Sequence, residues 1–375
     1  MCLPSQLAPA AYGALYLHIP FCASRCGYCD FTTEATSPGD PRLDAYVERL
    51  VRDIRSAARE GLLAQVTTVY IGGGTPSFLG SRRLVNLVYT LSLSMNLGSE
   101  TEFTLEANPE SLTPALVRDL YSLGVNRFSL GVQSFDDAEL AALGRAHDAN
   151  AARRALATIR ERADNVSVDL MCGIPHQSTA SWQHSLSEAL RGGASHVSVY
   201  PLTIEEATPF ANAIAAGHQA PPDEDVQAQM MEAAADVLGA AGLLRYEVAS
   251  YAHPGFECRH NIAYWTGVPY LGLGRGAAGM RTAADGMRER LLDGEVTERL
   301  TPAEAMREDL MCGMRMSAGV LHDAVHAAEP LVPGITERFE ELVALGLAAS
   351  AEGRYRPTSR GWLLGNELYG RIWNC

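Results

Sequence analysis

The sequence contains no lysine, and all 30 of its basic residues are arginine. A phosphate-binding P-loop needs a lysine, and so do Schiff-base and pyridoxal chemistry, so these enzyme classes are excluded. The sequence also has no apolar run of the about 20 residues that a membrane helix requires. The first 20 residues carry no lysine or arginine ahead of their apolar stretch. Neither a stable membrane span nor a secretory signal peptide is expected, and we predict a cytoplasmic protein.

Acidic residues outnumber basic ones, with 44 aspartate and glutamate residues against 30 arginines and a formal net charge of −14. A groove that follows a nucleic-acid backbone needs the opposite balance, so we expect no nucleic-acid partner. Hydrophobic residues make up 47% of the chain and charged residues 20%, which is typical of globular proteins. A length of 375 residues suits one large domain or two ordinary ones.

Strand and helix patterns alternate along the first part of the chain. The predicted strands are residues 14–20, 66–71, 101–105, 127–132, 166–170 and 196–202, and a helical stretch follows each of them. Strands separated by such helices lie parallel, which predicts an α/β fold. The two architectures that fit are a partial or closed (β/α) barrel and an open doubly wound sheet. In both, ligands bind at the carboxyl ends of the strands.

The pattern changes after the predicted barrel core, which takes residues 1–245. Residues 246–298 are rich in glycine and aromatic residues and predict a lid or a closing strand. Thr301-Pro302-Ala303-Glu304 has the form of a capping box and predicts the start of a helix. Helical patterns at 336–345 and from residue 360, with an extended stretch at 355–358 between them, predict a small, mainly helical, winged-helix-like domain over residues 299–375.

Three of the eight cysteines lie close together in the loop after the first predicted strand, in the sequence Cys22-Ala-Ser-Arg-Cys26-Gly-Tyr-Cys29. Clustered cysteines in a cytoplasmic protein indicate a metal site rather than disulfides. Three thiolates hold an iron–sulfur cube with one iron left open, whereas a structural zinc site takes four ligands. The alternative is a zinc loop with His18 or a distant cysteine as the fourth ligand.

The cysteine spacing, the aromatic Tyr28 before the third cysteine and the run Gly72-Gly73-Gly74-Thr75-Pro76 resemble the radical S-adenosylmethionine superfamily. The resemblance implies a partial (β/α)6 barrel, an electron donor, a 4Fe-4S cluster on Cys22, Cys26 and Cys29, and S-adenosylmethionine on the open iron. Further motifs narrow it to the coproporphyrinogen dehydrogenase-like branch, namely Leu105-Glu106-Ala-Asn108-Pro109, Gly131-Val-Gln133, Gly144-Arg145-Ala-His147 and Val168-Asp169. The implied S-adenosylmethionine contacts are Tyr16, Tyr28, Gly73, Gly74, Thr75, Glu106, Gln133, Arg145 and Asp169.

Within that branch, the oxygen-independent coproporphyrinogen III dehydrogenases carry a further cysteine two residues after the third cluster cysteine. This chain has Phe31 there, which resembles the heme chaperones of the branch. The resemblance implies transfer of heme to an acceptor protein, including a transient membrane-protein client. One alternative is a radical enzyme that abstracts hydrogen from a porphyrinogen, and another is an iron–sulfur or zinc protein without turnover. Whether the chain catalyses a reaction stays open at this point.

The segment His260-Asn261-Ile262-Ala263-Tyr264-Trp265 matches the His-Asn-x-x-Tyr-Trp motif that is associated with heme binding in those chaperones. The resemblance implies His260 as a heme contact, because an imidazole is an ordinary axial ligand of heme iron. Cys258 and His253 are the alternative heme ligands. In a second alternative the segment has no ligand role, and its side chains only anchor it to the barrel. The chain departs from the family pattern at Ala278, where a histidine is usual, so no ligand role is predicted there.

Overall fold

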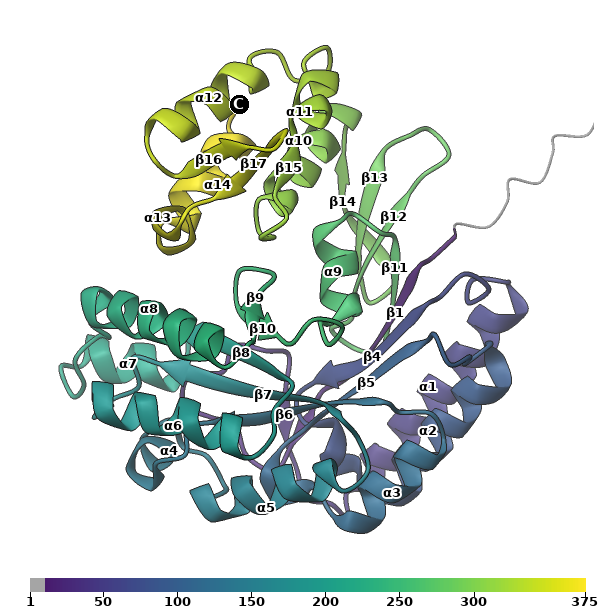
Figure 1. Cartoon of the computed structure of the whole chain (residues 1–375). Coiled ribbons are helices and arrows are strands. Elements are labelled where there is room, and N and C mark those ends of the chain that lie inside the picture. The colour runs from purple at the N-terminus through teal and green to yellow at the C-terminus, as the bar shows by residue number, and fades with distance from the viewer. Residues whose placement is uncertain (1–10) are drawn as a thin grey trace, which may run out of the picture.

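The computed structural model describes residues 11–375, and its largest feature is a curved sheet with parallel strands at the centre (Figure 1). Six consecutive neighbours in this sheet are parallel and are joined through helices. They are β1 (Ala14–Ile19), β4 (Thr68–Gly73), β5 (Glu102–Ala107), β6 (Arg127–Gln133), β7 (Asn165–Cys172) and β8 (His196–Pro201). The six predicted strand–helix units are therefore confirmed, with small shifts at the strand ends.

The helices that connect these strands lie on the outer face of the sheet (Figure 1). They are α1 (Pro41–Arg59), α2 (Gly80–Ser94), α3 (Pro114–Ser122), α4 (Asp137–Leu143), α5 (Ala149–Arg160) and α6 (Thr179–Arg191), with α7 (Pro209–Ala215) and α8 (Glu224–Ala240) after β8. Alternate strand residues such as Leu15, Val69 and Phe103 pack with these helices in one hydrophobic core. A doubly wound sheet has helices on both faces, so the partial (β/α)6 barrel is confirmed.

The inner face of the barrel is polar. Successive side chains of a strand point to opposite faces, so the residues between the core positions point inward. Tyr70 of β4 donates a hydrogen bond to Glu106 of β5, and Ser129 of β6 donates one to Asp169 of β7. Polar side chains therefore extend through the barrel interior toward the carboxyl ends of the strands.

Residues 246–298 extend the sheet at both of its edges. The chain passes from β9 (Leu244–Arg245) to β10 (Ser250–Ala252), which lies antiparallel to β8, and then through α9 (Arg259–Trp265) to β11 (Tyr270–Leu273), which lies parallel to β1. An antiparallel meander of β12 (Ala278–Thr282), β13 (Arg288–Leu292) and β14 (Glu295–Leu300) follows. β10 adds to the β8 side of the six parallel strands and β11 to the β1 side, and the sheet ends at β9 and β14. The strands of this segment therefore do not close the barrel. A role of the segment as a lid stays a prediction.

The C-terminal residues form a small helical unit with a three-stranded sheet of its own. Its elements are α10 (Pro302–Gly313), β15 (Val320–Leu321), α11 (His322–Ala328), α12 (Ile335–Ala344), β16 (Ala348–Ala351), β17 (Arg354–Pro357), α13 (Ser359–Leu363) and α14 (Gly365–Trp373). The capping box at Thr301 and Glu304 is confirmed, with each side chain bonding the other residue's backbone. This order of helices and strands is the expected winged-helix-like outline.

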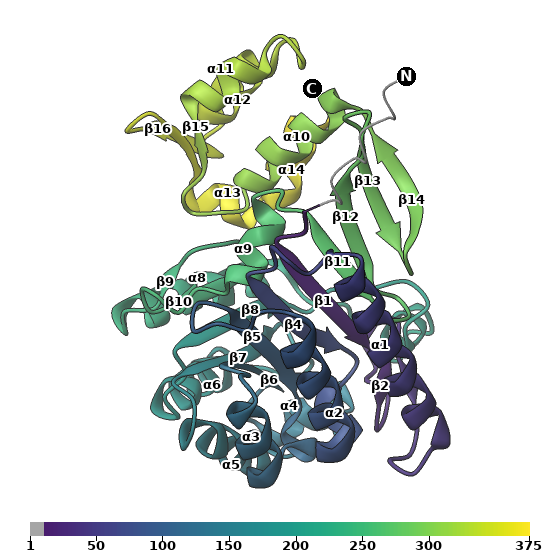
Figure 2. The same ribbon diagram turned by 90° about the vertical axis from the view of Figure 1, so that its right-hand side faces the viewer.

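Figure 2 shows α9 between the barrel and this C-terminal unit. The domain ranges 1–245, 246–298 and 299–375 stay a prediction. No helix within residues 11–375 is both long enough and apolar enough to cross a membrane.

Candidate functional site

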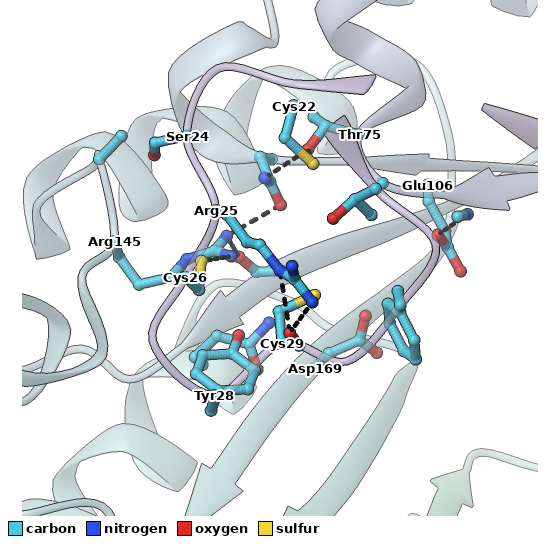
Figure 3. A pocket seen from close by; sticks show the side chains of 18 of the residues that line it. Cys22, Ser24, Arg25, Cys26, Tyr28, Cys29, Thr75, Glu106, Arg145 and Asp169 are labelled. Atoms are coloured by element: carbon cyan, nitrogen blue, oxygen red, sulfur yellow. Dashed lines mark hydrogen bonds between the residues drawn. The ribbon is translucent and has the colours of Figure 1, made fainter. Parts of the chain in front are cut away.

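A pocket of about 520 Å³ opens at the carboxyl ends of the parallel strands. Figure 3 shows its side chains, which come from the cysteine loop and from several strand ends. Eleven of the predicted site residues line it, together with the motif residue Asn108. The eleven are Cys22, Cys26, Cys29, Tyr28, Gly73, Gly74, Thr75, Glu106, Gln133, Arg145 and Asp169. The structure thus brings together residues that are far apart in the sequence.

The cysteine loop is held in place by backbone contacts at several points. At its ends, β2 (Phe21–Cys22) pairs in parallel with β3 (Glu34–Ala35). In its middle, Gly27 N–H donates to the carbonyl of Leu143 at 3.3 Å, and the carbonyl of Gly27 accepts from Phe210 N–H at 3.0 Å. A Cβ on Gly27 would lie 2.5 Å from the Phe210 ring. The loop therefore needs glycine at this position to rest against α7.

All three thiols face the pocket without forming disulfides. Burial raises the pKa of Cys22 to about 11 and also raises the pKa of Cys29. The hydroxyl of Thr75 donates to Cys22 Sγ at 3.3 Å, and Arg145 donates to Cys26 Sγ at 3.5 Å. Donors at this range favour thiolate sulfur, so two neighbours are already placed to stabilise cysteines that lose their protons to a metal centre.

The glycine run of β4 brings the main chain close to the cysteine loop. Gly73 adopts a φ of +115°, which side chains rarely allow. Its N–H donates to Glu106 Oε2 at 3.0 Å. A Cβ on Gly74 would lie 2.9 Å from Cys22 Sγ. Glycine at these two positions therefore lets the strand end form one wall of the pocket.

Two carboxyl groups line the pocket from neighbouring parts of the sheet. Burial raises the pKa of Glu106 to about 7, although hydrogen bonds from Tyr70 and Gly73 lower it. Burial also raises the pKa of Asp169, against hydrogen bonds from the hydroxyls of Ser198, Ser129 and Ser167. Each carboxyl thus has donors that orient it, and a hydrogen-bonding or cationic ligand would favour its ionised form.

Arg145 reaches into the pocket from the loop after α4. Its Nη2 donates to Asn108 Oδ1 and to the carbonyl of Gly131, both at 2.8 Å, and Asn108 in turn donates to Thr75 at 3.0 Å. The Nε atom of Arg145 is buried and has no hydrogen-bond partner. Buried donors without a partner are rare, and one at a pocket wall fits a site for an anionic group such as a carboxylate.

Gln133 enters the pocket through an irregularity in β6. The pairing of β6 with β7 shifts register between Gly131 and Gln133, and Gln133 has a left-handed φ of 69°. Such a shift turns a side chain away from the direction that strand alternation predicts. Strained backbone of this kind is common at binding sites.

Two predicted contacts lie outside the pocket lining, Tyr16 and His260. The hydroxyl of Tyr16 bonds with His18 Nδ1 at 3.0 Å, on the inner face of β1. His260 is 1% exposed, and its ring nitrogens bond with Thr68 Oγ1 and with the Tyr264 hydroxyl, both at 2.9 Å. Thr68 begins β4, so His260 lies at the amino-terminal end of the barrel, opposite to the cysteines.

Within residues 11–375, the fourth ligand that the zinc alternative needs is not provided by His18. Both ring nitrogens of His18 are hydrogen-bonded, to the Tyr16 hydroxyl and to the carbonyl of Thr32, each at 3.0 Å. Over residues 11–375, no group of three or more histidine, cysteine, aspartate or glutamate side chains is placed to hold a single metal ion.

Several pocket residues were not among the predicted contacts. Asn108 belongs to the motif at residues 105–109. It donates to Thr75 and accepts from Arg145, and an amide side chain can do both. Phe31 and Tyr200 also line the pocket, with 62% and 42% of their surface exposed. Exposed aromatic residues at a pocket mouth are a signal for a flat apolar ligand, but exposure is not readable from a single sequence.

Two family models and a solved structure match this chain. The model of the radical SAM superfamily matches residues 16–189, and that of the HemN C-terminal domain matches residues 300–364. The solved structure of coproporphyrinogen III oxidase (HemN) from Escherichia coli has a TM-score of 0.78 at 20% identity, covering 96% of this chain and 90% of that one, which shows a shared fold.

Sequence relatives are closer. The heme chaperone HemW of Bacillus subtilis is 33% identical to this chain, and the alignment covers 95% of this chain and 97% of that protein. The heme chaperone HemW of Mycobacterium tuberculosis is 36% identical, with 94% and 93% covered. At this identity and coverage, the chain belongs to the HemW family of radical SAM proteins.

Proposed function

We propose that this protein is a heme chaperone that binds a 4Fe-4S cluster and S-adenosylmethionine in the pocket. Membership of the radical SAM superfamily implies both groups. Cys22, Cys26 and Cys29 would hold the cluster. When bound, the cluster and S-adenosylmethionine supply one-electron chemistry.

The residues fit these groups. The three thiols and the sulfur-directed donors of Thr75 and Arg145 suit thiolate ligands. Gly73, Gly74 and Thr75 would present main-chain groups to the amino acid part of S-adenosylmethionine, and Arg145 would meet its carboxylate. The remaining proposed contacts are Tyr28, Glu106, Gln133 and Asp169, all of which line the same pocket. For Tyr16, which lies one layer below, we propose an indirect role through the barrel interior.

Heme is proposed as the cargo, and a heme acceptor protein as the recipient. The observation that carries this proposal is Phe31, which stands at the pocket where the dehydrogenases have a cysteine, in a chain whose relatives are heme chaperones. A phenyl ring supplies apolar contact and no thiol chemistry. We further propose an electron donor for the cluster and, as one client class, a membrane protein. We also propose a cytoplasmic location.

His260 as an axial heme ligand stays a prediction with a structural condition. In this structure the imidazole is buried and hydrogen-bonded at both nitrogens. Binding of heme iron there therefore requires α9 to move so that one nitrogen leaves Thr68 or Tyr264. Because His260 and the cysteines lie at opposite ends of the barrel, substitution of His260 should alter heme binding without changing the iron content.

The test is anaerobic reconstitution followed by heme titration and a porphyrinogen assay on the same sample. We expect about four irons and four sulfides per chain, stoichiometric heme uptake seen in the Soret band, and no conversion of coproporphyrinogen III to protoporphyrinogen IX. Serine at Cys22, Cys26 or Cys29 should abolish iron uptake. Serine at Cys312, a partly buried thiol in α10, is the matched control.

Two outcomes would count against the proposal. Stoichiometric zinc without iron uptake would make the site a zinc loop. Robust turnover of coproporphyrinogen III by the reduced protein with S-adenosylmethionine would instead assign the chain to the dehydrogenase function.

A further inference from the structure

Tyr70 lies inside the barrel between the pocket and α9. Its hydroxyl donates to Glu106 Oε1 at 2.6 Å, while Gly73 N–H donates to Glu106 Oε2. Its ring stacks on the imidazole of His260, with 5.1 Å between ring centroids and 28° between planes. One side chain therefore touches both a pocket carboxylate and the helix that carries the His-Asn-x-x-Tyr-Trp segment.

We propose that Tyr70 is a positioning residue for S-adenosylmethionine, whose hydroxyl fixes Glu106 at the pocket and whose ring is fixed in turn by His260. Tyr70 does not itself line the pocket, so it acts through Glu106. The inference rests on the proposed function, in which Glu106 contacts S-adenosylmethionine. It adds a physical connection between α9 and the pocket at the other end of the barrel.

Two hydrogen bonds of Glu106 define one orientation of its carboxylate. Burial keeps the pKa of Tyr70 well above its usual range, so the phenol stays protonated and donates. Charged and titratable groups also face Glu106 from each element around it, and these are Tyr16 of β1, Tyr70 of β4, Arg127 of β6, Asp169 of β7, Tyr200 of β8 and Tyr264 of α9. Losing the Tyr70 donor removes a contact that lowers the pKa of Glu106.

His260 provides a rigid surface for the Tyr70 ring. Its two ring nitrogens are bonded to Thr68 and Tyr264, and its backbone N–H donates to Glu102 Oε1 at 2.9 Å. Burial lowers the pKa of His260 to about 3, so the ring that stacks on Tyr70 is neutral. A ring bonded at both nitrogens, on a residue whose backbone is bonded as well, restricts its stacking partner. This restriction is what the buried segment contributes in the present arrangement.

The decisive variant is Tyr70→Phe, which keeps the ring and loses only the hydroxyl. Binding of S-adenosylmethionine is measured by anaerobic titration calorimetry on the reconstituted, unreduced protein, so that no turnover intervenes. We expect affinity to fall about ten-fold, as for loss of a hydrogen bond to a charged group. Because Glu106 then keeps its proton to higher pH, the pH at which affinity is half-maximal should be higher in Tyr70→Phe than in the parent protein. Iron content should not change.

Tyr251→Phe is the matched control. It also loses the hydroxyl of a buried tyrosine, one that accepts from Arg245 Nε at 2.8 Å, but Tyr251 lies on β10 and does not line the pocket. We expect parent affinity and an unshifted pH profile for this variant. An equal loss in both variants would show general loosening of the barrel and would overturn the proposal.

A second pair of variants tests the contact with α9. His260→Ala removes the stacking partner and should weaken binding about three-fold, in line with the energy of an aromatic pair. His260→Phe keeps a ring and should restore most of the affinity. Parent affinity in Tyr70→Phe overturns the inference and leaves the proposed function standing, whereas failure of the parent protein to bind S-adenosylmethionine overturns both. If His260→Ala binds S-adenosylmethionine as tightly as the parent protein, the proposed role of the His260 ring in fixing Tyr70 is refuted.

Discussion

At Gly74 the main chain approaches the cysteine loop so closely that no side chain fits between them. A Cβ there would lie 2.9 Å from Cys22 Sγ and from the carbonyl oxygen of Phe21, and 3.0 Å from that of Ile19. Main-chain atoms of paired strands yield less readily than the end of a flexible side chain. The absence of a side chain at Gly74 therefore helps to set the position of Cys22.

We expect Gly74→Ala to displace Cys22 and to lower the iron content of the reconstituted protein. Forcing one extra methyl group into such a contact costs about 1–3 kcal/mol of folding free energy, so the variant should still fold. Iron and sulfide analysis together with far-UV circular dichroism checks this. Gly98→Ala is the matched control, because nothing lies within 4 Å of its Cβ. Full iron content in Gly74→Ala would mean that the loop adapts to the added methyl group.

Most of the pocket residues were predictable because their proximity follows from topology. The three cysteines share one loop, and Glu106 and Asp169 lie on parallel strands whose carboxyl ends meet at one edge. The left-handed φ of Gln133 was not predictable, because no local residue pattern announces the register shift in β6. Anchoring of the His260 segment to the barrel was one of the predicted alternatives, but its partner was beyond prediction, since Thr68 lies 192 positions away in the chain.

At the scale of elements, α9 shows how a short helix is held by its surroundings. A helix of seven residues is not stable alone. Glu102 at the start of β5 accepts from the backbone N–H groups of Arg259 at 2.8 Å and His260 at 2.9 Å. A carboxylate at a helix amino terminus stabilises it through both hydrogen bonds and the helix dipole. The sequence predicted a lid or closing strand here because seven residues are too few for helical periodicity to appear.

The buried imidazole of α9 makes the stability of the protein depend on pH. The folded protein holds the pKa of His260 at about 3, chiefly through burial, whereas the unfolded chain has a histidine pKa of about 6.5. Between these values the unfolded state binds more protons, so the free energy of unfolding decreases as the pH falls. This contribution is fully present above pH 6.5 and is lost progressively toward pH 3.

We expect His260→Gln to remove that dependence. The difference in unfolding free energy between the parent protein and His260→Gln should shrink by about 2 kcal/mol between pH 7 and pH 5. Urea denaturation at each pH measures it. His218→Gln, at an exposed position, serves as the control. A difference that stays constant with pH would show that His260 becomes protonated in the folded state.

At the scale of the whole molecule, the two ends of the barrel have separate tasks. The carboxyl ends of the strands form the pocket, while the C-terminal unit is attached at the amino-terminal end through α9. Arg315 lies between two rings there, 5.2 Å from the centroid of Trp265 in α9 and 4.4 Å from that of Tyr369 in α14. Ser317 N–H also donates to the carbonyl of Tyr246 at 3.0 Å.

This arrangement predicts that Arg315→Ala loosens the C-terminal unit and leaves the cysteine site intact. Each cation–π contact contributes about 0.5–2 kcal/mol, so losing both should raise amide hydrogen exchange in α9 and α14 by roughly ten-fold. Exchange in the cysteine loop and the iron content should match those of the parent protein, because the pocket lies at the opposite end of the strands. Arg338→Ala is the control, since that arginine pairs with Glu341 within the C-terminal unit. If exchange rose in the cysteine loop as strongly as in α9, the loosening would not be confined to the C-terminal unit and the helix that attaches it.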